Sequence, residues 1–308
     1  MPTAAIDLGS NSALLLVVDD AGTVIADEAT VVGLGRGLGD GGTFAPDRAA
    51  AALDTLATYA ATALRLGVPP DQVRAVATSA SRRARDAPAF FARVTERTGL
   101  RFRIVSGDEE AALTFAGALQ GSPWAVGDAP VVVVDPGGGS TEVVAGRGLE
   151  RGTGGSMEVG TVRLTEAFLG TDVHDAAGVA PLVAAVRAEL ARLPPLPRPD
   201  VVIGVAGTVT TLATVRLGLP VWDADRVHGS LLERTWLRQT AQRLLPLDPA
   251  ARRAAVPAAP QRADYLAAGA LLLDEVLAHL DADALVVSVR GLRWALVGEV
   301  LPARPPRG

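Results

Sequence analysis

Two glycine turns carry the residues best suited to phosphate chemistry. Each follows an apolar strand with the pattern Asp-x-Gly-x-x-Ser, once from Asp7 and again from Asp135. A carboxylate at the end of such a strand lies at the edge of the sheet, and the glycine lets backbone N–H groups approach an anion closely. One such turn is often an ordinary hairpin, but the repeat predicts two turns that grip phosphate groups. The residues expected to bind phosphate there are Ser10, Asn11, Ser12, Gly137, Gly138, Gly139, Ser140 and Thr141.

Two adjacent glutamates, Glu109 and Glu110, lie between these turns. Ser106 and Glu109 have the spacing of a capping box at the start of a helix, which gives Glu109 a structural use. Glu110 has no such use and projects about 100° further around the helix axis. We interpret Glu110 as a general base that takes a proton from an attacking water. The alternative is a solvated surface glutamate.

Four carboxylates, those of Asp7, Glu110, Asp135 and Glu142, would repel one another if the fold brought them together. Two charges ~4 Å apart cost about 4 kcal/mol at an effective dielectric constant of ~20. A divalent cation relieves this repulsion, and an all-oxygen ligand set selects Mg²⁺ or Mn²⁺ over zinc. We therefore expect a Mg²⁺ site, with Mn²⁺ as a substitute, that uses Asp7, Asp135 and Glu142. The cation would neutralise phosphate oxygens and orient an in-line attack by water.

Two further segments are candidates for anion binding. Arg82 follows an apolar stretch that ends at Thr78, where its guanidinium can address a phosphate in bidentate fashion. Gly207 and Thr208 follow the apolar stretch Val201–Ala206 at an expected helix start, where free N–H groups can bind an anion or a nucleotide. The alternatives are an ordinary surface arginine and an ordinary strand-to-helix turn.

The composition excludes several classes of protein. With 308 residues, of which 49% are hydrophobic, the chain is long enough for two domains. Cysteine is absent, which excludes cysteine nucleophiles and thiolate zinc sites. All 29 basic residues are arginine, which excludes the lysine-containing phosphate loop and the strand lysine of protein kinases. The net charge of −5 argues against nucleic-acid binding, and the lack of a long apolar run or leader predicts a cytoplasmic protein that is not bound to a membrane.

The pattern of elements is also repeated. A strand, a glycine turn and a second strand open each half, and both halves continue with short buried strands that alternate with helices. The apolar run Val131–Val134 begins the second copy. This order predicts an α/β protein of two lobes, with residues 1–124 in the first and residues 125–308 in the second.

These motifs, in this order, resemble those of the exopolyphosphatase and guanosine pentaphosphate phosphatase family. The segments that carry the resemblance span most of the chain: Ala5-Ile6-Asp7-Leu8-Gly9-Ser10-Asn11-Ser12, Ala77-Thr78-Ser79-Ala80-x-Arg82, Ser106-Gly107-x-Glu109-Glu110-Ala111, Val134-Asp135-x-Gly137-Gly138-Gly139-Ser140-Thr141-Glu142, Gly160-x-Val162-Arg163-Leu164-x-Glu166 and Gly204-Val205-Ala206-Gly207-Thr208. The chain is similar to the short, two-domain members, because it stops before the helical region that longer relatives append.

The resemblance implies two actin-like (ribonuclease H-like) lobes with a Mg²⁺-containing active site in the cleft between them. In such enzymes the second glutamate of the pair, here Glu110, acts as the base. The acids that correspond to Asp135 and Glu142 serve the metal and the attacking water. Three departures from the family pattern, Pro136, Asp86 and Leu14, are expected to affect the choice of substrate more than the type of reaction.

The leading functional hypothesis is release of terminal phosphate from inorganic polyphosphate. Hydrolysis of guanosine pentaphosphate is the first alternative, since the same loops would support it. A nucleotide or alarmone sensor without turnover is the second, and an actin-like sugar kinase or chaperone ATPase is the third. A homodimer remains an open alternative that the sequence does not decide.

Overall fold

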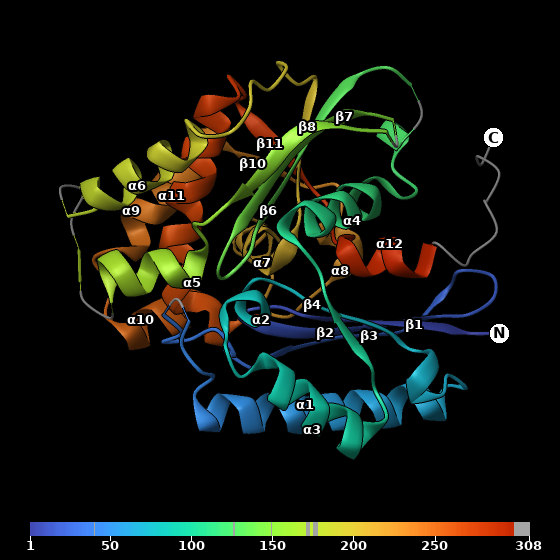
Figure 1. The fold of residues 1–308 in the computed structure, drawn as a ribbon. Helices are drawn as coiled ribbons and strands as arrows, with labels where there is room; N and C mark the ends of the chain where they lie inside the picture. Colours follow the sequence, from blue (N-terminus) through green and yellow to red (C-terminus); the bar gives the residue numbers. More distant parts are fainter. Residues whose placement is uncertain (40, 126, 149, 171–172, 175–177, 299–308) are drawn as a thin grey trace. The chain divides into compact units, whose positions relative to one another are not determined.

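The computed structural model describes residues 1–298 except 40, 126, 149, 171–172 and 175–177. The chain forms two compact units, each with a mixed β-sheet of its own (Figure 1). The first unit contains Met1–Gln120 together with the helix that starts at Leu292, and the second contains Gly121–Gly291. The described residues include no helix long and apolar enough to cross a membrane.

The sheet of the first unit has the strand order β3-β2-β1-β4-β5. Strands β1 to β3 form an antiparallel meander, and β4 and β5 add to β1 in parallel. The strands are β1 (Thr3–Leu8), β2 (Ser12–Val18), β3 (Val24–Val31), β4 (Arg74–Ala77) and β5 (Phe102–Ile104). The helices are α1 (Pro46–Arg65), α2 (Ser79–Arg83), α3 (Ala87–Thr98), α4 (Gly107–Leu119) and α12 (Leu292–Gly298).

Helices cover both faces of this sheet, with α1 and α3 on one side and α4 and α12 on the other (Figure 1). Helix α1 starts with Pro46, whose missing N–H is no loss at the first helical position. Its buried residues recur at the spacing of one helix face, including Leu53, Leu56 and Ala60. Tyr59 donates its hydroxyl proton into the sheet, where the carbonyl of Ala13 lies 3.1 Å away.

The sheet of the second unit has the order β10-β11-β9-β6-β7-β8. Its strands are β6 (Pro130–Pro136), β7 (Thr141–Arg147), β8 (Glu150–Met157), β9 (Val201–Gly204), β10 (Leu231–Glu233) and β11 (Ala284–Val287). The helices are α5 (Thr161–Leu164), which runs into a π-helical turn (Thr165–Leu169), α6 (Ala180–Leu190), α7 (Ala206–Arg216), α8 (Ala224–Val227), α9 (Arg234–Leu244), α10 (Pro249–Ala254) and α11 (Ala263–His279).

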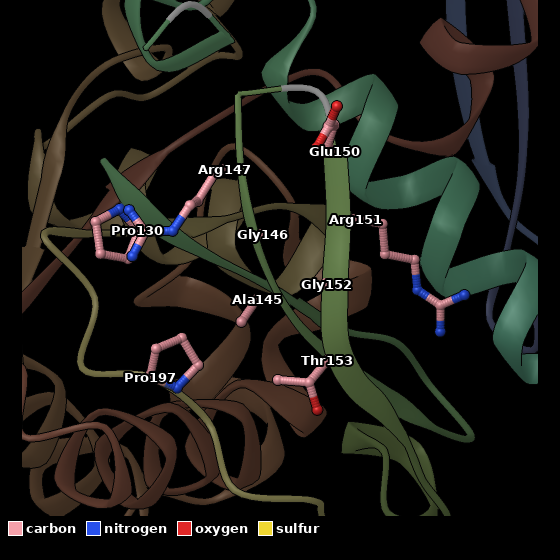
Figure 2. Close-up of a pocket in the computed structure, with 9 residues that line it drawn as sticks. All are labelled: Pro130, Ala145, Gly146, Arg147, Glu150, Arg151, Gly152, Thr153 and Pro197. Atoms are coloured by element: carbon pink, nitrogen blue, oxygen red, sulfur yellow. The ribbon is translucent and has the colours of Figure 1, made fainter. Parts of the chain in front are cut away.

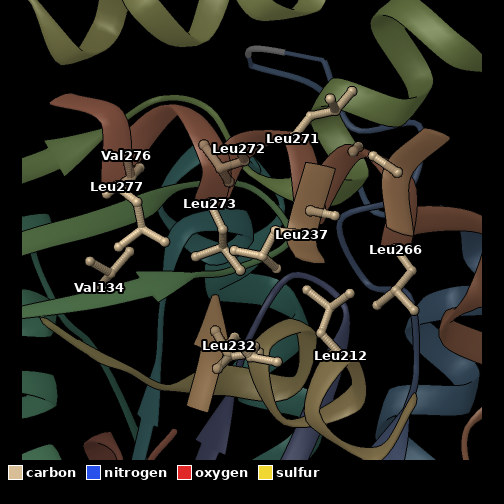
Figure 3. Packing of buried hydrophobic residues seen from close by; sticks show 14 of the residues in the cluster. Val134, Leu212, Leu232, Leu237, Leu266, Leu271, Leu272, Leu273, Val276 and Leu277 are labelled. Atoms are coloured by element: carbon tan, nitrogen blue, oxygen red, sulfur yellow. The ribbon is translucent and has the colours of Figure 1, made fainter. Parts of the chain in front are cut away.

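Helix α11 is the centre of the second core. It is rich in alanine and leucine, is buried over most of its length, and packs against α5, α6, α7 and α9 (Figure 3). Two acids interrupt its apolar surface, Asp274 and Glu275, and both are less than a tenth exposed. Arginines neutralise them: Arg238 donates to Asp274 at 3.0 Å and Arg187 to Glu275 at 2.6 Å.

The two sheets repeat one topology. An antiparallel three-stranded meander followed by two parallel strands gives β3-β2-β1-β4-β5 in one unit and β8-β7-β6-β9-β11 in the other, where β10 is added at the edge. The expected α/β class with two lobes, each built on a sheet of its own, is therefore confirmed. The register also aligns the two turns, since Asp7 pairs with Leu14 and Asp135 pairs with Glu142.

The division into units differs from the predicted boundary at one helix. Helix α12 follows the second unit in sequence but belongs to the first, because Leu292, Leu296 and Val297 pack against the first sheet. Arg293 adds a polar tie, donating to the carbonyl of Leu15 at 2.7 Å. Assigning all of 125–308 to the second lobe was therefore wrong for α12, and residues 299–308 lie outside the described part. The apolar face of a helix can be predicted from the sequence, but the sheet against which that face packs cannot.

Candidate active site

The turn between β1 and β2 is held by backbone hydrogen bonds on two sides. Within the turn, the N–H of Gly9 donates to the carbonyl of Ser12 at 2.9 Å. From the glycine-rich loop that follows β3, Gly33 donates to the carbonyl of Asn11 at 2.9 Å and Gly35 to that of Ser10 at 2.7 Å. A Cβ on Gly35 would lie 2.9 Å from the Cβ of Ser10, so only glycine fits this approach. The loop therefore fixes the turn.

Several buried polar atoms around this turn and the start of α2 have no hydrogen-bond partner among the described residues. Among them are Ser10 Oγ, Asn11 Oδ1, Ser79 Oγ and Ser81 Oγ. Buried polar groups are nearly always paired with protein or ordered water, so these three hydroxyls and one amide oxygen indicate room for a polar ligand or water. The sequence analysis selected Ser10 and Asn11 but missed Ser79 and Ser81. The signal was present, because both flank Ala80 in the segment that contains Arg82.

Glu110 is buried, with 8% of its surface exposed, and is not the solvated glutamate of the alternative reading. Its Oε2 accepts a hydrogen bond of 2.6 Å from Nη1 of Arg82, which also donates to the carbonyl of Val105 at 3.0 Å. Helix α4 begins as expected, with Ser106 Oγ accepting from the N–H of Glu109 at 3.1 Å. The Glu109 carboxylate itself pairs with Arg103. The structure therefore joins Arg82 and Glu110, which the sequence placed in separate roles.

In the second unit, Asp135 and Glu142 are directly opposite each other on β6 and β7. Directly opposed residues of an antiparallel pair project from the same face, and like charges there repel. Glu142 is 2% exposed, and its Oε1 accepts a hydrogen bond of 2.7 Å from Ser156 Oγ on β8. The edge of this sheet thus carries a paired set of hard oxygen ligands.

The loop between β6 and β7 is closely tied to the segment before α5. The hydroxyl of Thr141 donates to the carbonyl of Val159 at 2.6 Å, so Thr141 fastens the loop. The N–H of Gly137 donates to the carbonyl of Asp135 at 3.0 Å. Ser140 is 2% exposed and lies inside the turn. Thr141 and Gly137 were predicted to donate hydrogen bonds to phosphate. In the structure, the Thr141 hydroxyl and the Gly137 N–H instead donate to carbonyl groups of the protein.

The connection from β9 to α7 contains a strained residue. Ala206 has φ of +68°, a left-handed conformation that costs about 1–2 kcal/mol for a residue with a Cβ. Such strain is common at ligand sites. A Cβ on Gly207 would lie 1.9 Å from Nη1 of Arg262, so the guanidinium lies against the glycine backbone, and burial lowers the pKa of Arg262. The sequence analysis missed Arg262, because no motif surrounds it.

Comparisons with known proteins identify the family. Residues 16–303 match the model of the Ppx/GppA phosphatase family. The chain belongs to the Ppx/GppA phosphatase family. It is 36% identical over 292 residues to exopolyphosphatase 2 of Mycobacterium tuberculosis, an alignment that covers 90% of each protein.

Solved Ppx/GppA structures share the whole fold. The crystal structure of an exopolyphosphatase-like protein is 29% identical, with a TM-score of 0.88, and covers 97% of this chain and 98% of its own. The Ppx/GppA family member of Aquifex aeolicus is also 29% identical, with a TM-score of 0.79, and covers 97% of both chains.

The opposed carboxylates of Asp135 and Glu142 carry the hard oxygen atoms that divalent cations such as Mg²⁺ prefer. Among the residues that the structure describes, no group of three or more His, Cys, Asp or Glu side chains gathers as a metal site. Asp7 belongs to the first unit, whereas Asp135 and Glu142 form a pair within the second. Mg²⁺ is commonly held by one or two carboxylates together with substrate phosphates and water. The pair therefore fits such an ion.

A shallow pocket in the second unit is distinct from these loops (Figure 2). Pro130 and Arg147, which are paired at the far end of β6 and β7 from the turn, are among its lining residues. None of the predicted site residues lines it. We therefore do not assign the chemistry of this family to that pocket.

Proposed function

We propose that this protein is an exopolyphosphatase, a phosphohydrolase that releases terminal phosphate from inorganic polyphosphate. Membership of the Ppx/GppA family and the likeness to exopolyphosphatase 2 along 90% of each chain support this activity. The structural observation that carries the proposal is the buried carboxylate of Glu110 held by Arg82 at 2.6 Å. A binding-only protein has no need of a buried, oriented base.

Glu110 is the general base in this proposal. Nη1 of Arg82 holds the Glu110 carboxylate in position through a hydrogen bond of 2.6 Å. The oxygen of water forms a bond to the terminal phosphorus, and its proton passes to Glu110. The bond from that phosphorus to the bridging oxygen breaks, and the oxygen stays on the shortened polyphosphate as an anion. The products are orthophosphate and a chain shorter by one phosphate.

The other roles follow from the chemistry of each turn. We assign Asp135 and Glu142, which are opposed on β6 and β7, to Mg²⁺, which would supply charge neutralisation at phosphate oxygens when bound. Phosphate oxygens are assigned to polar side chains and backbone amides of the two turns and of the α7 start: Ser10, Asn11, Ser12, Gly138, Gly139, Ser140, Gly207 and Thr208. The unpaired hydroxyls near Ser10 support this assignment.

The test compares Glu110→Gln with Glu109→Gln in a phosphate-release assay with Mg²⁺. The two glutamates are adjacent and both pair with arginine, but Glu110 is buried and Glu109 is more exposed. Loss of a general base lowers kcat by about 10²–10⁴-fold. We expect that loss for Glu110→Gln and near-normal kcat for Glu109→Gln. Glu110→Gln should melt somewhat lower, because its bond to Arg82 is weakened, but both variants should be folded at the assay temperature. Full activity of Glu110→Gln would remove Glu110 from the mechanism.

The substrate panel should contain short polyphosphate, long polyphosphate and guanosine pentaphosphate. We expect phosphate release to be most efficient, by kcat/KM, from polyphosphate. Preference for guanosine pentaphosphate would assign the protein to the alternative activity. Calorimetric binding of either ligand without any product would instead indicate a sensor.

A further inference from the structure

The beginning of α5 faces the glycine loop between β6 and β7. The N–H of Thr161 donates to the carbonyl of Gly137 at 2.8 Å, and the Thr161 hydroxyl donates to the same oxygen at 3.3 Å. The next two N–H groups, of Val162 and Arg163, donate to the carbonyl of Gly138 at 3.0 and 3.1 Å. The first amides of this short helix are therefore used to hold two carbonyls of the loop.

Gly160 permits this contact because it has no side chain. Its φ of −136° and ψ of 168° are extended values that suit any residue, so conformation does not require glycine here. Space does. A Cβ at this position would lie 2.5 Å from both the carbonyl carbon and the carbonyl oxygen of Gly138. Any larger residue must push the loop away from α5.

The orientation of these carbonyls determines where two N–H groups point. In a trans peptide the C=O and the following N–H point in opposite directions, and no cis peptide bond is present in the described residues. Because the carbonyls of Gly137 and Gly138 face α5, the N–H groups of Gly138 and Gly139 face the other way. The N–H of Gly137 donates to the carbonyl of Asp135 and is therefore not a third donor.

We propose that Gly160 and Thr161 are positioning residues for phosphate binding, which hold the amides of Gly138 and Gly139 in place as the two backbone donors of this loop. Neither residue contacts the substrate. Each acts through the loop carbonyls that it crowds or hydrogen-bonds. The inference rests on the proposed function and deepens it, since it names the residues that hold the phosphate-binding amides of this loop in place.

Two variants disturb the contact in different ways. Gly160→Ala adds the Cβ that collides with Gly138. Thr161→Pro removes both donors to Gly137, and proline is favoured at the first position of a helix and after an extended residue. Gly155→Ala is the matched control for the first, because its Cβ would meet only Leu193 Cδ2, at 3.4 Å. Thr161→Ser keeps both donors and is the control for the second.

The experiment is a titration of the full-length protein with inorganic phosphate in the presence of Mg²⁺, followed by the NMR shifts of the glycine amides. In the wild type we expect the Gly138 and Gly139 amides to move and the Gly137 amide to stay. Loss of a charge-assisted hydrogen bond weakens binding by about tenfold or more. We expect that loss in Gly160→Ala and Thr161→Pro, and wild-type affinity in Gly155→Ala and Thr161→Ser.

Kinetics with polyphosphate separate positioning from a structural role. If the amides bind phosphate before and during reaction, KM rises while kcat of the folded variants changes little. A merely structural role would lower the melting temperature and leave phosphate affinity unchanged, which would overturn the inference. So would a wild-type titration in which Gly138 and Gly139 do not move. Inactivity of the wild type on every polyphosphate would overturn the proposed function instead, while the titration with phosphate would still decide the inference.

Discussion

At the residue scale, the unpaired hydroxyls of the first unit are the clearest sign of a ligand. Ser79 and Ser81 are each 3% exposed, and neither hydroxyl oxygen has a partner among the described residues. A buried hydroxyl without a hydrogen bond destabilises the folded state, so we expect such a group to have a functional role. Contact with a phosphate oxygen or its hydration water is such a role.

Ser79→Ala should therefore separate stability from activity. Removing an unpaired buried hydroxyl relieves its desolvation penalty, so the free energy of unfolding should stay constant or rise by about 1 kcal/mol. The KM for polyphosphate should rise, because one donor is lost. Denaturant unfolding and steady-state kinetics on the same preparation check both. Lower stability with unchanged KM would show that the hydroxyl serves the fold.

Ala206 offers a second residue-scale test. Its left-handed backbone, with φ of +68°, suits glycine better than alanine. Ala206→Gly should raise the free energy of unfolding of the second unit by about 1 kcal/mol, less the entropy that glycine adds to the unfolded chain. Chemical denaturation measures the change. A marked loss of stability would mean that the methyl group makes a contact worth more than the strain.

At the scale of elements, the hydroxyl of Tyr59 joins α1 to the meander of the first sheet. It bonds to the carbonyl of Ala13 on β2 and to Thr30 Oγ1 on β3, at 3.1 and 2.9 Å. Burial raises the pKa of Tyr59 above its ordinary value of 10.0. The folded state therefore keeps the proton after the unfolded chain has begun to release it.

This shift predicts a loss of stability in alkali. Below the unfolded pKa, near 10, the contribution of Tyr59 is fully present, and it falls as pH rises from there toward the higher folded pKa. Tyr59→Phe should be less stable than the wild type at neutral pH, by about 1 kcal/mol for the lost hydrogen bonds. It should also lose less stability between pH 9 and pH 11. Parallel slopes for the two proteins over that range would contradict the assignment.

The elements show what sequence reasoning can and cannot reach. The two Asp-x-Gly turns were predictable because each is a local pattern after an apolar strand, and the capping serine Ser106 was predictable for the same reason. The Arg82–Glu110 pair was not, since its members lie on different helices, 28 positions apart in the chain, and no spacing rule joins them. Arg262 was missed because its neighbour, Gly207, is distant in the chain.

At the scale of the whole molecule, each unit has its own sheet and its own core. Asp274, buried on α11, is held by Arg234 at 2.7 Å and by Arg238 at 3.0 Å. These pairs lie entirely within the second unit. Weakening these ion pairs should therefore reduce the stability of the second unit and leave that of the first unchanged.

Asp274→Asn should destabilise the second unit by about 2 kcal/mol, because charge-assisted hydrogen bonds from two arginines become weaker. Amide hydrogen exchange can locate the effect. We expect faster exchange in α9 and α11 and unchanged exchange in β1 and β2. Equal acceleration in both units would show that they unfold as one cooperative body.

The repeated sheet differs at one decisive pair of positions. Opposite Asp135 stands an acid, Glu142, whereas opposite Asp7 stands a leucine, Leu14. The two ends of a linear inorganic polyphosphate chain are chemically identical, so the chain itself has no direction. A protein that removes one terminus at a time must supply that direction itself, and the acidic pair of Asp135 and Glu142, which Asp7 and Leu14 do not match, gives the hairpin of the second unit a chemistry of its own.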